Sequence, residues 1–185
     1  MAAFAFAKLR FPFKRALFVV FMSSLVIPYE VIMIPQYLLV WELGWVNTFR
    51  ALIIPQVVWV FGIFLLIQFF TDVPRDILDA GKIDGASWFK VYQKIVLPTA
   101  VPALITLGLM TFLAQWDAFL WPLIVINEDK KQMIQVAIAS FQSLRDISWG
   151  KILAATSISS IPILILFLFL QKYYVQGITM SGVKG

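Results

Sequence analysis

The chain has 185 residues, of which 61% are hydrophobic and 14% are charged, and its formal net charge is +5. A soluble domain carries about 25% charged residues, so this composition indicates that a lipid bilayer is the main solvent. The chain has no cysteine and no histidine, which excludes disulfides, thiol catalysis and thiolate metal sites and removes the commonest general base. We expect no enzyme active site, no metal and no cofactor. The cations flank apolar runs, so nucleic acid is not an expected partner.

The chain begins with an apolar segment over residues 1–7. It resembles the end of a membrane helix more than a signal peptide, because no basic segment precedes it and no mature domain follows a cleavage site. This beginning predicts that earlier spans of the protein are missing from the chain.

Four later stretches are long enough to cross a bilayer, which takes about 20 apolar residues in a helix. They cover residues 16 to about 40, 51–71, about 99–126 and 152–171. The acidic residues inside them are Glu30, which lies between Pro28 and Pro35, and Asp117. The predicted fold is an all-α membrane protein, a polytopic transmembrane helix bundle with about four spans and a single domain over 1–185.

The basic residues predict the orientation of these spans. Ten of the 15 cations precede the first predicted span, lie in the loop 72–98 or follow the last span. The other five are Arg50, Lys130, Lys131, Arg145 and Lys151. The positive-inside rule therefore places both termini and the loop in the cytoplasm.

The loop 72–98 is longer than the usual connection of about 4 to 6 residues, so we expect it to be structured. Residues 75–83 predict a short helix with apolar side chains towards one side. These side chains are Ile77, Leu78, Ala80 and Ile83. The Asp84-Gly85 pair is a turn signal, because glycine adopts positive φ freely.

A second amphipathic helix is predicted after the turn, with Phe89, Tyr92 and Val96 spaced along one face. We expect it to end at Leu97-Pro98, because proline biases its predecessor away from helix. The result is a cytoplasmic helix–turn–helix whose apolar residues are available for a groove on another protein.

The loop sequence resembles the cytoplasmic "EAA" loop of ABC-importer permeases. The family pattern is Glu-Ala-Ala, three residues, Gly, nine residues and Ile-x-Leu-Pro, and the spacing matches throughout. Asp79 replaces the glutamate, and Gly81 replaces the second alanine at a cost of about 1 kcal/mol in helix propensity. The resemblance implies an ATPase-coupling role for Asp79, Ala80, Gly81, Asp84, Gly85, Ala86, Ile95, Leu97 and Pro98.

Four further segments resemble the carbohydrate branch of this family, of the maltose and glycerol-phosphate type. They are residues 5–12, 27–30, 116–122 and the C-terminal Gly182-Val183-Lys184-Gly185. Family members have about six spans, so the resemblance implies that the first span and most of the second are absent.

The resemblance implies a permease subunit of a binding-protein-dependent importer for a sugar or sugar derivative, in the plasma (inner) membrane of a bacterium or archaeon. Its implied partners are a dimeric ABC ATPase, a second permease subunit and an extracytoplasmic solute-binding protein. ATPase closure would move the short helix after Gly85 and switch the spans between inward- and outward-facing states. The chain has no Gly-x-x-x-x-Gly-Lys-[Ser/Thr] loop to hold ATP itself.

Glu30, Trp116 and Asp117 are the candidate substrate-pathway residues. An acidic residue inside a membrane is costly and by default marks a pathway or a pair. Alternatively, Trp116 marks the outer interface with Asp117 near water, and Glu30 lies at a solvated helix end. Family members have Trp-Asn-Asp where this chain has Trp-Asp-Ala.

Three other functions stay open. An ABC permease for an amino acid or an inorganic ion shares the loop pattern. A secondary transporter would carry its driving chemistry inside the membrane, where Glu30 and Asp117 are the candidates. An intramembrane enzyme would need a nucleophile and a base.

Overall fold

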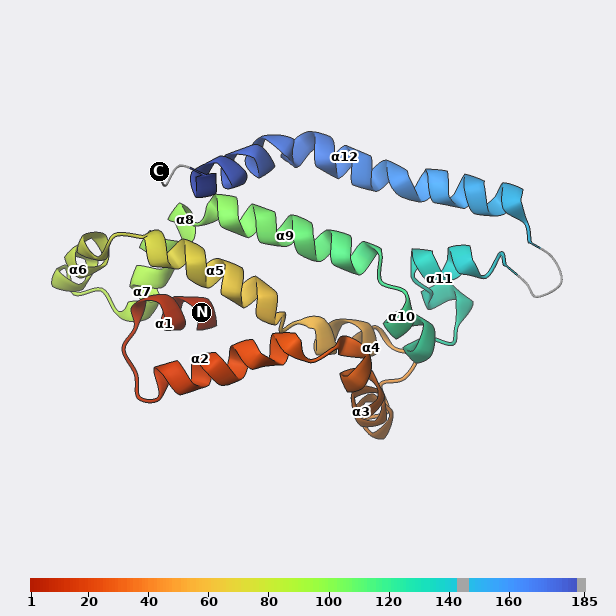
Figure 1. Cartoon of the computed structure of the whole chain (residues 1–185), viewed down its shortest axis with the longest axis horizontal. Helices are drawn as coiled ribbons and strands as arrows, with labels where there is room; N and C mark the ends of the chain where they lie inside the picture. Colours follow the sequence, from red (N-terminus) through yellow and green to blue (C-terminus); the bar gives the residue numbers. More distant parts are fainter. Residues whose placement is uncertain (143–146, 183–185) are drawn as a thin grey trace. The chain divides into compact units, whose positions relative to one another are not determined.

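A computed structural model describes residues 1–142 and 147–182 (Figure 1). Arg145, which entered the orientation prediction, and the C-terminal residues Val183-Lys184-Gly185 lie outside the described residues. The described elements are helices, with one isolated antiparallel bridge between Gln142 and Ile147. The chain divides into two compact units, which are described separately below.

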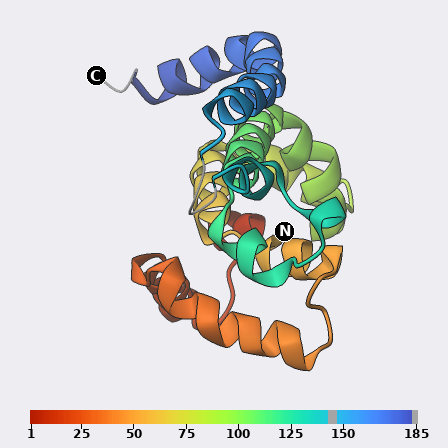
Figure 2. The same cartoon turned by 90° about the vertical axis from the view of Figure 1, so that its right-hand side faces the viewer.

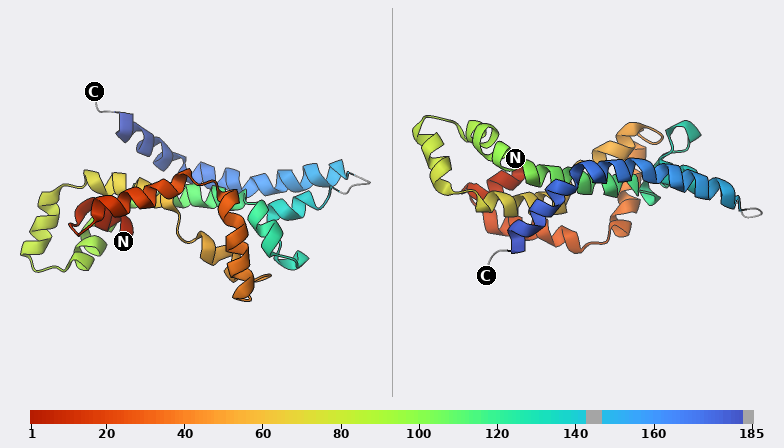
Figure 3. Two further views of the ribbon diagram at one scale, coloured as in Figure 1. Left: turned by 60° about the horizontal axis from the view of Figure 1, so that its bottom comes forward. Right: turned by 90° about the horizontal axis from the view of Figure 1, so that it is seen from above.

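The first unit comprises residues 1–27, 59–108 and 172–185. Its elements before α9 are α1 (Ala2–Lys8), α2 (Lys14–Ser23), the 3₁₀ turn η1 (Ser24–Val26), α5 (Val60–Asp72), α6 (Arg75–Ile83), α7 (Trp88–Val91), the π-helical turn η3 (Tyr92–Val96) and α8 (Leu97–Thr99). The apolar start of the chain is thus helical, as predicted. Helix α1 lies along α5 (Figures 1 and 3).

The core of the first unit forms where α1 meets α5 and the loop helices. Phe4 is its central side chain and is 1% exposed. Its ring meets Phe70 edge-on at 6.5 Å and Tyr92 at 5.4 Å between ring centroids. The other buried residues of this core are Ala3, Ile67, Leu78, Val91, Val96 and Ala100. Since aromatic pairs of this geometry add to the energy of apolar burial, the loop helices are fixed to α1 and α5.

The second unit comprises residues 28–58 and 109–171. Helix α9 (Val101–Trp116) ends in it, and α12 (Trp149–Gly182) begins in it. Its other elements are α3 (Tyr29–Glu42), α4 (Phe49–Ile53), the 3₁₀ turn η2 (Ile54–Gln56), α10 (Leu120–Val125), the 3₁₀ turn η4 (Asp129–Lys131) and α11 (Ile134–Ala139). Helices α4 and α10 lie side by side (Figures 1 and 2), where Trp121 donates a hydrogen bond from Nε1 to the Ala51 carbonyl at 2.9 Å.

The predicted spans are all apolar helical regions, but only the last is one unbroken helix in the structure. Within α12, residues Trp149–Phe169 are long and apolar enough to cross a membrane, with a mean hydropathy of 2.3. Three further pairs of consecutive helices are long and apolar enough to cross a membrane only when the two helices of a pair are counted together. By length and composition, the described part of the chain therefore has one to four candidate spans, in line with the predicted fold class.

The first predicted span is divided into two helical parts, because helicity stops at Ile27 and Pro28, but α2 with η1 and α3 are together long and apolar enough to cross a membrane. Ile27 has φ −78° and ψ 118°, which is extended backbone. The ring of the following proline disfavours the helical conformation at Ile27, and Pro28 has no N–H to donate. The stretch predicted over residues 51–71 is divided in the same way, since the backbone is extended at Trp59, between η2 and α5, and its two parts are together long and apolar enough to cross a membrane.

The third predicted span starts close to the observed start of α9 at Val101, but it extends too far, since α9 stops at Trp116. Leu120–Val125 form a separate short helix, α10. Pro122 explains the gap, because in one continuous helix its ring would clash with the carbonyl four residues earlier. In α10 it occupies the first turn, where N–H groups have no intrahelical partner.

Candidate functional site

Helix α6 spans Arg75–Ile83, the range predicted from the sequence. Asp76 lies in its first turn and Lys82 in its last. Both placements favour the helix, because its N-terminal end carries partial positive charge and its C-terminal end partial negative charge.

The apolar side chains of α6 do not all face the same way. Leu78 is buried in the core of the first unit, but Ile77 and Ile83 are 46% and 86% exposed. The prediction of a single apolar side was therefore wrong for Ile83, which lies away from the half of the helix that Ile77, Leu78 and Ala80 share.

Helix α6 ends in a glycine turn, as the sequence predicted. Gly85 has φ +77°. Its N–H donates to the Lys82 carbonyl and the Ala86 N–H donates to the Gly81 carbonyl, both at 3.0 Å. This pair of bonds is a Schellman motif, which satisfies helix-end carbonyls and requires left-handed backbone at the residue after the cap.

Two side-chain contacts hold the start of the next helix. The Ser87 hydroxyl accepts from the Lys90 backbone N–H at 3.3 Å, so Ser87 caps α7. The Lys82 ammonium lies 5.2 Å from the centre of the Trp88 ring and also donates to the Ala86 carbonyl at 2.8 Å. Cation–π contacts of this kind stabilise even exposed sites, so Lys82 ties the end of α6 to the beginning of α7.

The second loop helix does not end at Leu97-Pro98, so that prediction was wrong. Helical structure continues through η3 and α8 to Thr99, and the backbone departs from it at Ala100, with φ −93° and ψ 8°. Pro98 lies in the first turn of α8. The wide π-helical turn before it replaces regular α-helical hydrogen bonding, which lets the chain pass a proline without ending the helix.

Gly81 of α6 faces side chains of α7 and η3. A Cβ added there would lie 2.7 Å from Ile95 Cδ1 and 3.4 Å from Val91 Cγ2. The family pattern has alanine at this position, and the sequence alone showed only the loss of helix propensity. The packing supplies a reason for glycine, since Ile95 fills the space that a side chain would take.

The remaining coupling candidates differ in exposure. Ala86 and Leu97 are half-buried, and Ala86 packs against the core. Asp79, Ala80, Asp84 and Pro98 are exposed. The nine candidate residues therefore belong to one structured helix–turn–helix of the first unit, with a buried side that packs on α1 and α5 and an exposed side.

Three apolar side chains on the exposed side form what we call the loop tip. They are Ile83, Trp88 and Phe89, which are 86%, 40% and 54% exposed. Trp88 also packs against Phe4 of the core at 6.3 Å between ring centroids, whereas Ile83 and Phe89 are the more exposed pair. Exposed apolar groups held on a rigid frame are typical of a protein interface.

Asp79 also borders a cavity of about 570 Å³ beside the loop. The cations Lys8, Arg10 and Arg75 line the same cavity, with Trp88 and two leucines. Lys8 donates to the carbonyls of Thr71 and Val73, at 3.0 and 2.6 Å. It thereby fixes α1 to the C-terminal end of α5.

The three substrate-pathway candidates belong to the second unit. Glu30 is exposed in the first turn of α3. Trp116 ends α9 and stacks on Phe112 at 5.2 Å between ring centroids, and its buried Nε1 has no acceptor among the described residues. Asp117 is exposed and accepts from Gln135 Nε2 at 3.4 Å. No hydrogen bond or ion pair joins Glu30 to Asp117 in the described part of the chain.

Sequence reasoning missed a polar group next to Glu30. The Tyr29 hydroxyl accepts from Gln56 Nε2 at 3.1 Å and from Gln36 Nε2 at 3.4 Å. The spacing of Tyr29 and Gln36, seven residues apart on one helix face, was a usable signal, but the contribution of Gln56 required the fold.

Sequence reasoning also missed a junction at Asn47, a non-glycine residue with φ +61°. Its side chain accepts from the backbone N–H groups of Asn127 and Glu128 and donates to Glu128 Oε1 at 2.8 Å. Lys131 pairs with Glu128 at 2.9 Å and donates to the Asn47 carbonyl at 3.0 Å. Donation from Lys131 and then from Asn47 lowers the pKa of the exposed Glu128 carboxyl.

The sequence of the chain matches the family described as "Binding-protein-dependent transport system inner membrane component" over residues 1–180. The chain belongs to this family of membrane permeases. It is 32% identical over its full length to the arabinooligosaccharides transport system permease protein AraQ of Halalkalibacterium halodurans, of which it covers 66%. It is 39% identical over 147 residues, 78% of its length, to the trehalose/maltose transport system permease protein MalG of Thermococcus litoralis, of which it covers 53%.

A solved structure shares the fold. A bacterial ABC transporter involved in the import of the acidic polysaccharide alginate matches 93% of this chain and 66% of its own chain, with a TM-score of 0.82 and 22% identity. This likeness confirms the predicted helical permease fold. The chain spans 53% to 66% of the length of the two relatives named above.

Proposed function

We propose that the chain is the permease part of an ATP-driven importer for a sugar or sugar derivative. Its family is binding-protein-dependent, and two relatives carry names that specify arabinooligosaccharides and trehalose or maltose. The proposed partners are a dimeric ABC ATPase that hydrolyses ATP, a second permease subunit and an extracytoplasmic solute-binding protein. Uptake of labelled oligosaccharides, compared with an amino acid and an inorganic ion, tests the substrate class.

The loop tip is the observation that carries the proposed coupling. Its Ile83 and Phe89 side chains are more than half exposed, while the same helices are fixed through Leu78 and Val91 to the core that contains α5. A displacement of the loop tip is therefore transmitted to α5, because no flexible linker separates the tip from this helix. Packed elements of this kind move as bodies between discrete states.

The test replaces one exposed phenylalanine at a time. Phe89→Ser removes apolar surface from the loop tip, and Phe49→Ser removes a matched side chain from the second unit, since the two are 54% and 59% exposed. We expect Phe89→Ser to weaken co-purification of the ATPase subunit and to lower transport by about tenfold, the scale of losing one interface anchor worth more than about 1 kcal/mol. Equal effects of the two substitutions would refute docking through the loop tip.

The topology forms part of the same proposal: both termini and the loop 72–98 face the cytoplasm. The excess of cations on that side supports it. Because the chain has no cysteine, single cysteines at Lys90 and Gln132 report sidedness without background. We expect a membrane-impermeant reagent to label position 132 from outside the cell and position 90 only after the membrane is opened. Labelling of both from outside contradicts the orientation.

Glu30, Trp116 and Asp117 remain the proposed substrate-pathway residues. The unpaired indole N–H of Trp116 and the hydroxyl–amide group around Tyr29, next to Glu30, support this assignment. Sugars are bound by such hydrogen-bonding groups together with aromatic faces. Glu30→Gln and Asp117→Asn are expected to change the KM for transport more than membrane abundance, and unchanged kinetics in both would exclude a role in the pathway.

A further inference from the structure

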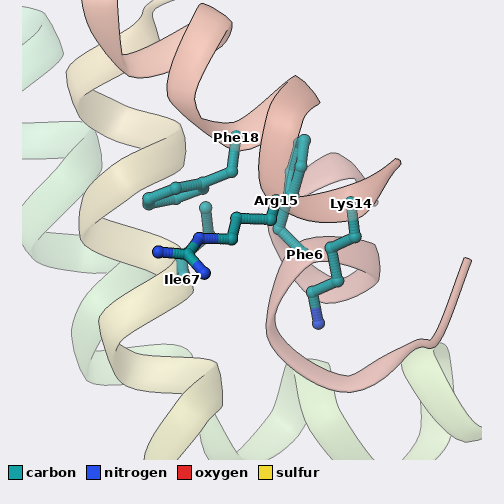
Figure 4. A pocket seen from close by; sticks show the side chains of 5 residues that line it. All are labelled: Phe6, Lys14, Arg15, Phe18 and Ile67. Carbon is teal, nitrogen blue, oxygen red and sulfur yellow. The ribbon is translucent and has the colours of Figure 1, made fainter. Parts of the chain in front are cut away.

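An apolar groove of about 410 Å³ lies in the first unit, away from the loop tip. Three of its lining side chains are apolar, namely Phe6 from α1, Phe18 from α2 and Ile67 from α5. The other two are the cations Lys14 and Arg15 at the start of α2. Figure 4 shows Arg15 extending toward Phe18 and Ile67, while Lys14 turns away from them.

The groove is formed in advance by aromatic packing. The Phe6 ring meets Phe18 edge-on at 5.9 Å, Phe11 edge-on at 5.6 Å and Phe21 in a stack at 6.1 Å, between ring centroids. Rings held on several sides keep their positions, so a ligand would meet a rigid apolar wall at little cost in ordering.

Helix α2, which lines the groove with Phe18, exposes further apolar side chains. Leu17, Val19 and Val20 are 51%, 59% and 68% exposed on this helix. Together with η1 and α3, α2 passes the test of length and apolarity for a broken membrane span. In a membrane permease, such a surface faces acyl chains, and the cations at its first turn lie where apolar chain gives way to polar loop.

The two cations differ in their partners. Lys14 Nζ donates to the Leu9 carbonyl at 3.0 Å and so closes the connection between α1 and α2. The Arg15 guanidinium makes no hydrogen bond with the described residues, and the one ion pair among them is that of Lys131 with Glu128. Among the described residues, no acidic side chain lines the groove. The Arg15 guanidinium is therefore a free planar fork of donors, a geometry that matches the two free oxygens of a phosphodiester.

The position of these cations is unfavourable for the helix itself. Both lie in the first turn of α2, which contains no acidic residue. Positive side chains there oppose the helix dipole. A phosphate group bound beside them would remove this repulsion, whereas a neutral or zwitterionic ligand would do so less.

We propose that this groove binds an anionic phospholipid of the bilayer, with one acyl chain along Phe6, Phe18 and Ile67 and the phosphodiester on Arg15 with the charge of Lys14 nearby. The ligand is thereby a structural lipid held at the junction of α1, α2 and α5. The proposal depends on the membrane location of the family and not on the coupling role of the loop, because lipid retention requires neither ATP nor sugar.

The test counts lipids retained by the transporter complex. The complex is exchanged into mild detergent with phosphatidylglycerol or phosphatidylcholine of identical acyl chains, and bound lipid is measured by native mass spectrometry. Arg15→Gln removes the proposed phosphate ligand. Arg10→Gln is the matched control, because Arg10 lies five residues away with the same charge but borders the other cavity.

We expect the unmodified complex and Arg10→Gln to retain phosphatidylglycerol, and Arg15→Gln to retain about tenfold less, since losing hydrogen bonds to a charged group commonly costs that factor in affinity. Phosphatidylcholine should be retained about as weakly by all three. Equal retention by the two variants, or of the two lipids by the unmodified complex, overturns the proposal.

A second measurement locates the acyl chain. Phosphatidylglycerol with a photoreactive acyl chain should crosslink to peptides that contain Phe6 or Phe18. Crosslinks confined to other segments, or protection of this groove by another subunit in the assembled transporter, would show that a different occupant covers it.

Discussion

Replacing Gly85 with valine perturbs the coupling loop at one backbone torsion. Gly85 has φ +77°, and a Cβ added there meets nothing within 4 Å. The cost of a side chain is therefore conformational and not a steric clash with neighbours. It amounts to about 1–2 kcal/mol for an ordinary L-residue in the left-handed region and up to about 3 kcal/mol for a strained position.

A penalty of about 2 kcal/mol corresponds to a roughly thirtyfold shift away from the native turn. The turn holds α6 through the Schellman bonds at 3.0 Å, and its direction places Trp88 and Phe89 at the loop tip. We expect Gly85→Val to reach the membrane at normal abundance while losing ATPase-subunit co-purification, substrate-stimulated ATP hydrolysis and transport. Gly85→Asn should keep most of each, because asparagine tolerates this conformation.

Gly44 offers a matched control for Gly85. It has φ +67° and equally open surroundings, and it follows α3 in the second unit. Gly44→Val therefore carries a similar backbone cost outside the loop. Membrane abundance, co-purification and transport per complex should be measured on one preparation of each variant. Normal transport by Gly85→Val, or an equal loss in Gly44→Val, would refute the reasoning.

Two further predictions concern packing and charge. Gly81→Val is expected to destabilise the complex by about 1–3 kcal/mol and lower its melting temperature, because the added Cβ would lie 2.7 Å from Ile95 Cδ1. Gly108→Val should leave the melting temperature nearly unchanged, because a Cβ there meets nothing within 4 Å. Because folding lowers the pKa of Glu128, its carboxylate stabilises the junction at Asn47 above the ordinary pKa of 4.5. This stabilisation is lost as the pH falls through the pKa of the folded chain. Asn47→Ala and Glu128→Gln should therefore increase protease cleavage near residue 128 at neutral pH. Glu128→Gln should also remove the extra cleavage that acid causes in the unmodified chain. A pH dependence of cleavage that Glu128→Gln leaves unchanged would contradict this assignment.

The coupling loop was the part of the fold most open to prediction. The range of α6 and the turn at Gly85 follow from local signals: amphipathic spacing, an aspartate–glycine pair and charges that suit the helix ends. The length of the helix that contains Pro98 could not be predicted from local signals, because a proline ends a helix in some surroundings and is accommodated in others. Pro28 coincides with an end of helicity, whereas Pro35 and Pro162 lie inside helices.

Hydropathy located the apolar helices but not their interruptions. A window of apolar residues records composition, whereas the breaks at Ile27 and after Trp116 depend on backbone torsions and on which N–H groups a proline leaves unused. The junction at Asn47 was hidden for another reason. Its partners at Asn127 and Glu128 are about 80 residues away in the sequence, and no local pattern reports such a pairing.

Contact between the loop tip and the ATPase subunit is the central claim, and site-specific photocrosslinking tests it most directly. A photoreactive phenylalanine derivative at Ile83, which is 86% exposed, is compared with the same group at Val26, which is 82% exposed on the apolar η1. The account predicts a crosslink from position 83 to the ATPase subunit that changes in yield when ATP is bound, and no such crosslink from position 26. Absence of the ATPase crosslink from position 83 in a transport-competent complex would contradict the proposed coupling.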